Sequence, residues 1–406
     1  MTSRLHPDTS HVHAPVRSRE PFSAVAMPIE RASTVVFDDL EAFQRRGERL
    51  YDGFSYGLYG TPTSRRLEDH VAELEGGVRA LVTPSGMAAM TLATMASCRS
   101  GDRLLVPETL YGPARDMAQN FLGPLGVETV CYDPCLGSDI TSLLDERTRL
   151  VWVESPGSGT FEIQDVPAIA EAAHRVGALV AADNTWASHL LFKPLARGAD
   201  ISMQALSKHA SGHGDLLMGS LAVRDEALFR RLKDTARFLG YGVSPDDCAL
   251  CERGLMTMPV RMRHASATAD RLIDFLSARP EIARILHPAR PDHPGHAIWK
   301  RDFVGSAGVF AIVLRPDLAS LQAEALRRMR LFRLGASWGG VHSLIAVNDP
   351  RKGRTMRDWL PPGPVWRLSV GLEDAGDLIA DLAEAFALFA DAGQPEAAGV
   401  SGRAAE

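Results

Sequence analysis

A lysine and an aspartate, each at the end of an apolar run, are the side chains with the clearest chemical potential in this sequence. Lys208 follows the run 201–206, and Asp183 closes the run 178–182. A partly buried lysine has a lowered pKa, so Lys208 could form a Schiff base and act as a base. Asp183 could hold the protonated nitrogen of a pyridine ring and keep that ring an electron sink. The commoner alternatives are a solvated loop lysine and an aspartate that caps a turn.

Two further features lie at the ends of predicted strands. The stretch 83–89 (Thr-Pro-Ser-Gly-Met-Ala-Ala) runs from a strand into a helix, whose first amides and positive end could bind a phosphate. Tyr111 could stack on a planar cofactor, although an aromatic residue near a strand end more often belongs to the core. The order along the chain is phosphate turn, aromatic ring, aspartate and lysine, which matches the needs of pyridoxal phosphate (PLP).

The elements that would position these residues alternate between short apolar strands and helices. Such an alternation predicts βαβ units and a buried, mostly parallel sheet, with the ligand site outside the carboxyl ends of its strands. The predicted strands are 80–83, 103–106, 128–132, 150–154, 178–182, 201–206 and 220–223, and the helices between them include 86–96, 113–121 and 166–176.

The second half of the chain has mixed elements, which predict a smaller α+β domain. Its expected helices are 262–276, 321–329 and 375–389, and its expected strands are 308–314 and 365–370. We therefore predict four regions: an N-terminal arm (1–60, the first 24 residues mobile) that contacts a neighbouring subunit, a PLP-binding large domain (61–257), a small domain (258–393) and a disordered tail (394–406).

Composition narrows the class of protein. The chain has 406 residues, of which 45% are apolar, and its net charge is −6 with no basic block. We therefore expect two domains and no binding to nucleic acid or membrane. Five scattered cysteines and the lack of an apolar leader predict a cytoplasmic protein without a disulfide framework. The pairs Cys131/Cys135 and Cys248/Cys251 are interpreted as buried thiols and not as zinc ligands, so no metal is predicted.

Nine short segments together resemble the cystathionine β-lyase/γ-synthase family of PLP enzymes, from about residue 28 to residue 388. The resemblance implies an α/β protein with the aspartate-aminotransferase type of fold (fold type I). The segments are Tyr56-Gly-Leu-Tyr-Gly-Thr-Pro-Thr, Leu74-Glu-Gly-Gly, Ser85-Gly-Met-Ala-Ala, Tyr111-Gly-Pro, Glu154-Ser-Pro-Gly-Ser, Asp183-Asn-Thr-Trp, Ser207-Lys with Gly212-His-Gly-Asp, Ser337-Trp-Gly-Gly and Arg367-Leu-Ser-Val-Gly-Leu-Glu-Asp.

The resemblance also implies a role for each matched residue. Lys208 would carry PLP and move protons, Asp183 would pair with the ring nitrogen, and Tyr111 would stack on the ring. Arg367 would grip the substrate carboxylate through a two-pronged pair. The phosphate would be bound by Ser85, Gly86, Met87 and Ser207.

Two more implied roles concern assembly and the substrate. Tyr56 would reach the phosphate of a neighbouring subunit, so a homodimer is the minimum and a homotetramer is expected. With Lys208 and Tyr111, Tyr56 completes the set of predicted catalytic residues. The backbone at Ser337 would help to position the carboxylate of a small amino-acid substrate.

Trp186 and Trp338 favour the β-lyase branch of the family. Members that act at Cγ typically have Phe and Leu at these two places, although a Trp could simply fill volume. We assign both residues to substrate binding. The predicted reaction is β-elimination of cystathionine or a related S-substituted cysteine to a thiol, pyruvate and ammonia.

Three departures from the family pattern keep other functions open. Leu58 replaces a phosphate-binding Arg, His209 replaces a Tyr, and His342 replaces a Glu. The alternatives are a γ-lyase or γ-replacement enzyme, a specialised carbon–sulfur lyase of secondary metabolism, and a non-catalytic scaffold with the same fold.

Overall fold

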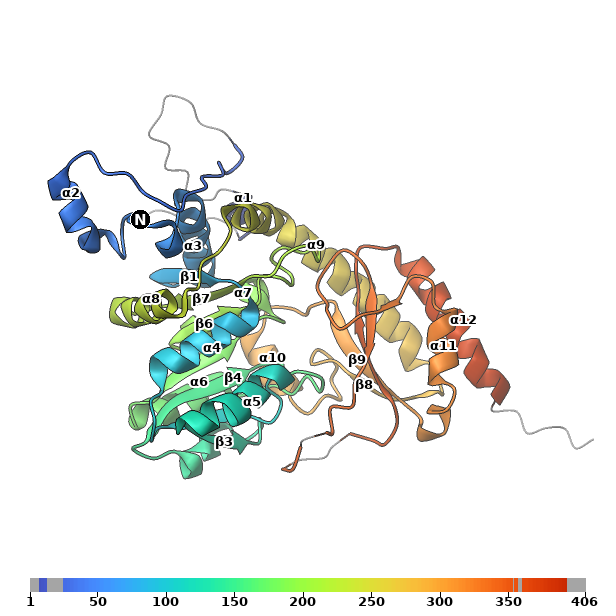
Figure 1. Ribbon diagram of the computed structural model, residues 1–406. Helices are drawn as coiled ribbons and strands as arrows, with labels where there is room; N and C mark the ends of the chain where they lie inside the picture. The colour runs from blue at the N-terminus through green and yellow to red at the C-terminus, as the bar shows by residue number, and fades with distance from the viewer. Residues whose placement is uncertain (1–6, 13–24, 353, 357–359, 393–406) are drawn as a thin grey trace, which may run out of the picture.

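The computed structural model describes residues 7–12, 25–352, 354–356 and 360–392. Two sheets organise this part of the chain, and the long helix α9 (Pro245–Ser277) runs from one to the other (Figure 1). The predicted tail 394–406 lies outside the described residues, as do 1–6 and 13–24 of the arm.

The larger sheet has seven strands in the order β1-β7-β6-β5-β4-β2-β3. All neighbouring pairs are parallel except those of β7, which is antiparallel to both β1 and β6. The prediction of a mostly parallel sheet is confirmed. The strands are β1 (Arg79–Thr83), β2 (Arg103–Pro107), β3 (Glu128–Tyr132), β4 (Thr148–Glu154), β5 (Leu179–Asp183), β6 (Ile201–Gln204) and β7 (Gly219–Val223).

Both faces of this sheet are buried. Along β4, Val151 and Val153 belong to one apolar cluster, whereas Leu150 and Trp152 belong to another. Because successive side chains of a strand point to opposite faces, each cluster covers one side of the sheet. Burial on both faces explains why these strands are continuous apolar runs and could be located from sequence.

Helices surround the larger sheet, and several have clear caps. The side chain of Thr61 caps α3, and Ser85 caps α4. The expected single helix 113–121 is instead a short α-helix followed by a π-helical turn, η3. The helices of this part are α2 (Leu40–Gln44), α3 (Pro62–Glu75), α4 (Gly86–Ser97), α5 (Gly112–Asp116), η3 (Met117–Leu122), α6 (Val166–Arg175), α7 (Ser188–Leu191) and α8 (Glu226–Leu239).

The smaller sheet has the order β10-β11-β12-β9-β8 and packs against α9 and α12. Its strands are β8 (Ile282–Leu286), β9 (Val309–Leu314), β10 (Arg333–Leu334), β11 (Leu344–Val347) and β12 (Val365–Ser369), with helices α10 (His296–Asp302), α11 (Gln322–Arg328) and α12 (Ala375–Ala392). Short 3-10 helices are present at η1 (Arg45–Arg49), η2 (Gly57–Tyr59), η4 (Gly123–Leu125), η5 (Gly137–Leu143), η6 (Pro194–Arg197) and η7 (Pro316–Leu318).

The helix α9 begins well before the predicted start at residue 262. Pro259 lies inside this helix, although a proline in a helix interior removes one backbone hydrogen bond. Its 33 residues cross the proposed domain boundary at 257/258, so one continuous helix belongs to both predicted domains.

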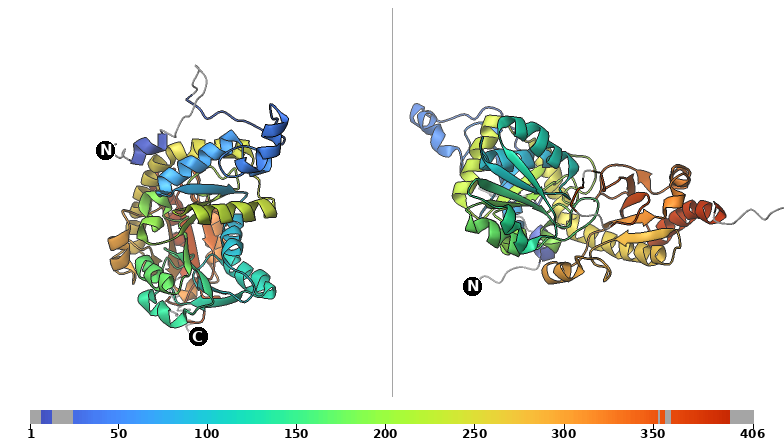
Figure 2. Two further views of the ribbon diagram at one scale, coloured as in Figure 1. Left: turned by 90° about the vertical axis from the view of Figure 1, so that its left-hand side faces the viewer. Right: turned by 90° about the horizontal axis from the view of Figure 1, so that it is seen from below.

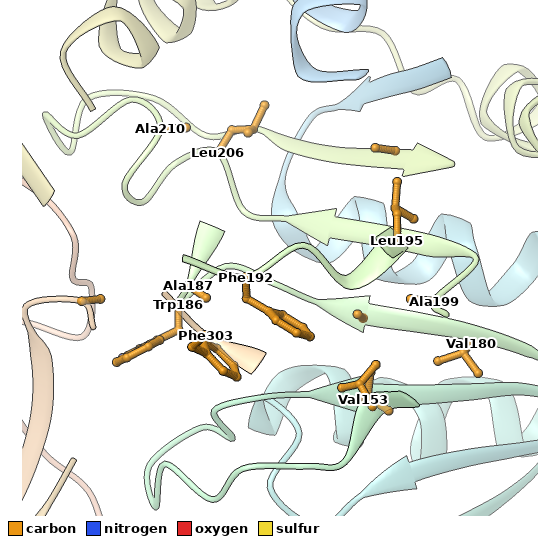
Figure 3. Packing of buried hydrophobic residues seen from close by; sticks show 14 of the residues in the cluster. Val153, Val180, Trp186, Ala187, Phe192, Leu195, Ala199, Leu206, Ala210 and Phe303 are labelled. Atoms are coloured by element: carbon orange, nitrogen blue, oxygen red, sulfur yellow. The ribbon is translucent and has the colours of Figure 1, made fainter. Parts of the chain in front are cut away.

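Aromatic side chains fill the space between the two parts of the molecule. The rings of Phe192 and Phe303 stack with their centroids 4.6 Å apart, next to Trp186 (Figure 3). The indole N–H of Trp186 donates to the carbonyl of Val309 at 3.0 Å. This bond fixes the smaller sheet against the carboxyl end of β5. The molecule is elongated, and the smaller domain forms one of its two ends (Figure 2).

The N-terminal region has two described parts. The short helix α1 (Pro7–Val12), within the segment that we expected to be mobile, packs on α9, where Asp8 pairs with Arg263 at 2.8 Å. Residues 25–60 extend from the body and expose apolar side chains, among them Val36 at 90% and Leu40 at 68%. Within the described chain, no helix has the length and apolar character needed to cross a membrane.

We expect Gly254→Ala to destabilise the protein. A Cβ at this position in α9 would lie 2.4 Å from the carbonyl oxygens of both Ala210 and Ser211. Alanine favours a helix by about 1 kcal/mol over glycine, but these backbone atoms cannot turn aside. The free energy of unfolding should therefore fall by about 1–3 kcal/mol, measured by chemical denaturation. The control is Gly123→Ala, where φ is −54° and nothing lies within 4 Å of the added Cβ; an equal loss there would contradict the steric argument.

Candidate active site

The predicted chemical residues gather at the carboxyl ends of the parallel strands. Asp183 ends β5, in register with Glu154 at the end of β4. Lys208 follows β6 by four residues, and Gly86 begins α4 just after β1. The smaller domain contributes Ser337, which contacts Lys208. Parallel strands thus bring residues distant in sequence to one edge of the sheet.

Lys208 is held between the two domains. Its Nζ donates to the hydroxyl of Ser337 at 2.8 Å and lies 5.5 Å from the ring centroid of Trp338. Burial lowers the pKa of the Lys208 amine, and the charge of Arg367 lowers it further, while Asp183 opposes both. This environment therefore makes the neutral amine, which is the nucleophilic and basic form, more accessible than in a solvated lysine.

The loop after Lys208 is fixed by contacts with α9. The guanidinium of Arg261 donates to the carbonyls of Ala210 at 3.2 Å and Gly254 at 2.7 Å. Gly212 has a φ of +70°, and its added Cβ would collide with Arg261. These contacts hold the turn that carries Lys208 in one conformation.

Asp183 is almost fully buried, and its carboxylate is already oriented. The backbone N–H and the hydroxyl of Thr185 both donate to Oδ1, at 2.9 and 2.5 Å. Burial raises the pKa of Asp183, whereas the bonds from Thr185 and the charge of Lys208 oppose that rise. Because both bonds use Oδ1, the other oxygen can face a protonated ring nitrogen.

The start of α4 provides an anion-binding turn. The hydroxyl of Ser85 accepts the N–H of Ala88 at 3.0 Å, and the first amides of the helix, at Gly86 and Met87, have no acceptor within a helix. A Cβ on Gly86 would lie 2.8 Å from that of Ala205, so only glycine lets the helix end approach β6 this closely. The 12-residue helix therefore presents donors at the edge of the site.

Ser207 has other partners in this structure. Its hydroxyl accepts the N–H of Met218 at 2.9 Å and lies 3.1 Å from the carbonyl of the same residue. The predicted bond from Ser207 to a phosphate remains a prediction.

Arg367 and Ser337 lie together on the smaller domain. One terminal nitrogen of Arg367 donates to the carbonyls of Ala336 at 2.8 Å and Ser337 at 3.1 Å. Its Nε is buried and has no hydrogen-bond partner among the described residues. A guanidinium with a buried donor still unused fits the capture of a carboxylate.

Tyr111 forms an exposed wall of the site, with 45% of its surface accessible. Its backbone N–H donates to Oε2 of Glu154 at 2.6 Å. Glu154 lies in the matched segment Glu154-Ser-Pro-Gly-Ser, but the resemblance implied no role for it. The available signal was an acidic residue that closes an otherwise apolar strand.

Trp338 and His209 form a contact that links the two domains next to Lys208. Their ring centroids are 5.3 Å apart in an edge-to-face arrangement, and Nε2 of His209 donates to the carbonyl of Trp186 at 3.2 Å. Burial lowers the pKa of His209 to about 3, so the imidazole is neutral at physiological pH. His209, one of the three departures from the family pattern, thus helps to hold the indole of Trp338 in place.

Two predicted site residues have other contacts within this subunit. Trp186 is 6% exposed and lies in the interdomain core, as the volume-filling alternative supposed. Tyr56 contacts its own arm, through a bridge to Thr34 and a ring contact with Tyr59. Their predicted roles at the substrate and at a neighbouring phosphate are not formed by contacts within this subunit.

The arrangement fits PLP. It offers an amine for covalent attachment at Lys208, a carboxylate at Asp183 for a ring nitrogen, an aromatic wall at Tyr111 and a helix end at Gly86 for a phosphate. Over the described ranges, no cluster of three or more His, Cys, Asp or Glu side chains could hold a metal ion.

Comparisons with known proteins agree with this donor set. The family model described as "Cys/Met metabolism PLP-dependent enzyme" matches residues 8–387. A putative cystathionine β-lyase of Rhizobium johnstonii is 42% identical over 364 residues, covering 89% of this chain and 90% of the relative. The cystathionine β-lyase of Salmonella typhimurium is 39% identical over 390 residues, covering 94% and 98%.

A solved structure agrees as well. The cystathionine γ-synthase of Xanthomonas oryzae superposes with a TM-score of 0.86 at 30% identity, covering 95% of this chain and 98% of that one. Fold type I is therefore confirmed, and the cofactor is PLP. The chain belongs to the family of PLP-dependent enzymes of cysteine and methionine metabolism.

Proposed function

We propose that this enzyme catalyses β-elimination of cystathionine or a related S-substituted cysteine, giving a thiol, pyruvate and ammonia. The observation that carries the proposal is the convergence of three groups at one site: the amine of Lys208, the buried carboxylate of Asp183 and the guanidinium of Arg367. Relatives named cystathionine β-lyase, at 39–42% identity, support the same reaction.

Each group has a distinct task in this reaction. Arg367, held by the carbonyls of Ala336 and Ser337, binds the substrate carboxylate and fixes the position of Cα. PLP, when bound, supplies an electron sink for negative charge at Cα. Lys208 then takes the Cα proton, the thiolate departs from Cβ, and water completes the release of pyruvate and ammonia.

The position of Trp338 favours β- over γ-chemistry. Its indole lies beside Lys208 and is fixed by His209, so it narrows the space next to the base. The structural similarity to a γ-synthase keeps a γ-lyase or γ-replacement enzyme as the alternative. A specialised lyase of secondary metabolism is a further alternative, because the chain departs from the family pattern at Leu58, His209 and His342. A scaffold without turnover has no need of Lys208, Asp183 and Arg367 together.

We further propose a cytoplasmic homo-oligomer, with a dimer as the minimum and a tetramer expected. The exposed apolar side chains of the arm, such as Val36, support burial against a second copy. Cys98, Cys131, Cys248 and Cys251 are free thiols, which supports a reducing compartment.

The first prediction concerns the covalent link at Lys208. The purified enzyme should be yellow, and Lys208→Ala should lose the visible absorption band, because only this amine can hold PLP covalently. Absorption spectra and mapping of the peptide labelled after borohydride reduction measure this. The control is the exposed Lys300→Ala, which should keep the band. A wild type that stays colourless when incubated with PLP would contradict the proposal.

The second prediction concerns the product. With cystathionine as substrate, we expect pyruvate as the 2-oxo acid, because Trp338 favours cleavage at Cβ. Chromatography of derivatised 2-oxo acids identifies the product. Predominant 2-oxobutyrate, or replacement at Cγ of an activated homoserine, would show that the enzyme belongs to the alternative branch.

The third prediction concerns Tyr56. If it completes the site of a second copy, Tyr56→Ala and Lys208→Ala should each have low activity, and hybrids made by co-expression should regain part of it. The reason is that one site of each hybrid dimer combines Lys208 from one subunit with Tyr56 from the other. Separately purified proteins mixed without subunit exchange are the control. Hybrids no more active than Tyr56→Ala alone would contradict a shared site.

A further inference from the structure

Glu154 is a buried carboxyl group to which neither the matched sequence segments nor the proposed reaction assigns a role. It ends β4, is 8% exposed, and lies in register with Asp183 on β5. Its Oε2 accepts the N–H of Tyr111 at 2.6 Å, and its Oε1 lies 2.6 Å from the hydroxyl of Ser158. The two oxygens thus connect β4 to two loops that border the site.

No cation compensates Glu154. Within the described ranges Glu154 forms no ion pair. Its carboxyl group has two hydrogen-bond partners, the backbone amide of Tyr111 and the hydroxyl of Ser158. Arg354, which contacts Thr160 in the loop after β4, is already paired with two other carboxylates, Glu162 and Glu108. A buried charge without a cation is costly, so such a carboxyl group takes up a proton instead.

The charge of Asp183 adds to this effect. Burial raises the pKa of Glu154 well above its ordinary value, and the neighbouring Asp183 raises it further. Of the two carboxyl groups, Asp183 is the better stabilised anion, because it accepts two bonds from Thr185 and faces Lys208. If only one of the two adjacent groups is ionised, the negative charge is better stabilised on Asp183 than on Glu154.

We propose that Glu154 carries a proton in the resting holoenzyme and acts as a positioning residue for Tyr111. In this state its carbonyl oxygen accepts the N–H of Tyr111, and its own O–H donates to Ser158. The backbone N–H of Ser158 in turn donates to the carbonyl of Thr109 at 2.9 Å, close to Tyr111 in the chain. The inference rests on the site assigned under the proposed function.

The proton has a functional consequence. An ionised Glu154 would place a second negative charge beside Asp183 and compete with it for positive charge at the ring nitrogen and at Lys208. A neutral carboxyl group anchors the Tyr111 wall and leaves Asp183 as the only anion of the pair.

The decisive comparison is between Glu154→Gln and Glu154→Ala. Glutamine reproduces the neutral acid, because its carbonyl accepts from Tyr111 and its amide donates to Ser158. We expect Glu154→Gln to keep the visible PLP band and to retain PLP on dialysis. Glu154→Ala leaves the Tyr111 amide unpaired and should weaken PLP binding roughly tenfold or more. It should also lower kcat/KM more than Glu154→Gln does.

Ser158→Ala, which removes only the hydroxyl, is the matched control. Its PLP retention and its kcat/KM should lie between those of Glu154→Gln and Glu154→Ala.

Two measurements report the proton independently of turnover. The infrared difference spectrum of wild-type minus Glu154→Gln holoenzyme should contain the carbonyl band of a protonated carboxyl group. The thermal stability of wild type relative to Glu154→Gln should fall as pH rises above the ordinary carboxyl pKa of 4.5. The sign follows because a raised pKa in the folded state stabilises the protein at low pH, and that stabilisation is lost as pH increases.

Opposite outcomes would overturn the inference. If the infrared band is absent and Glu154→Gln loses PLP as readily as Glu154→Ala, Glu154 acts as an anion. A stability difference that does not change with pH would also contradict the proton. If both measurements succeed but the enzyme cleaves no thioether, the proposed function fails and the role of Glu154 stands.

Discussion

The site depends on the electrostatic coupling of Lys208 and Asp183 in a partly desolvated space. Burial alone would drive the lysine toward its neutral form and the aspartate toward its protonated form. Each group offsets part of the cost of the other, and Thr185 adds two hydrogen bonds on the acidic side. Removal of either partner would leave an uncompensated buried charge. The strands and α9 must therefore hold both groups rigidly. On the side of Lys208, Arg261 of α9 does so by hydrogen bonds to the carbonyls of Ala210 and Gly254.

A second consequence of this arrangement is that the site spans two domains. The smaller domain supplies Ser337 and Arg367, and its loop returns to the larger domain where Arg354 pairs with Glu162 and Glu108. The N–H and hydroxyl of Thr355 also donate to Glu108, each at 2.8 Å. Because Glu108 lies three residues before Tyr111, this loop and Glu154 hold the same wall of the site from two sides. The domain arrangement and the cofactor wall are thus parts of one packed unit.

The departures from the family pattern have local physical meanings. His209 fits beside Gly339, where a Cβ would lie 3.0 Å from its Nδ1, and its ring packs on Trp338. Leu58 points toward Gly242 within its own subunit, and Arg65 pairs with Glu68 at 3.0 Å. Arg65, a basic residue seven positions after Leu58, therefore already has a carboxylate partner within this subunit.

Sequence alone determined the strand ends and the residues that follow them, because these depend on local patterns. Apolar runs bounded by polar residues placed Asp183 and Lys208 at the edge of the sheet, and the Ser85-Gly86 turn is a property of consecutive residues. What depends on distant contacts needed the tertiary structure. Glu154 acquires its partner only because Tyr111, 43 residues away, is folded over it. Trp186 is held by a hydrogen bond to the carbonyl of Val309 in β9, and α9 continues through the buried Pro259 without a break. Burial and long-range hydrogen bonds decide which of the polar residues at a strand end carries charge, and no local pattern records them.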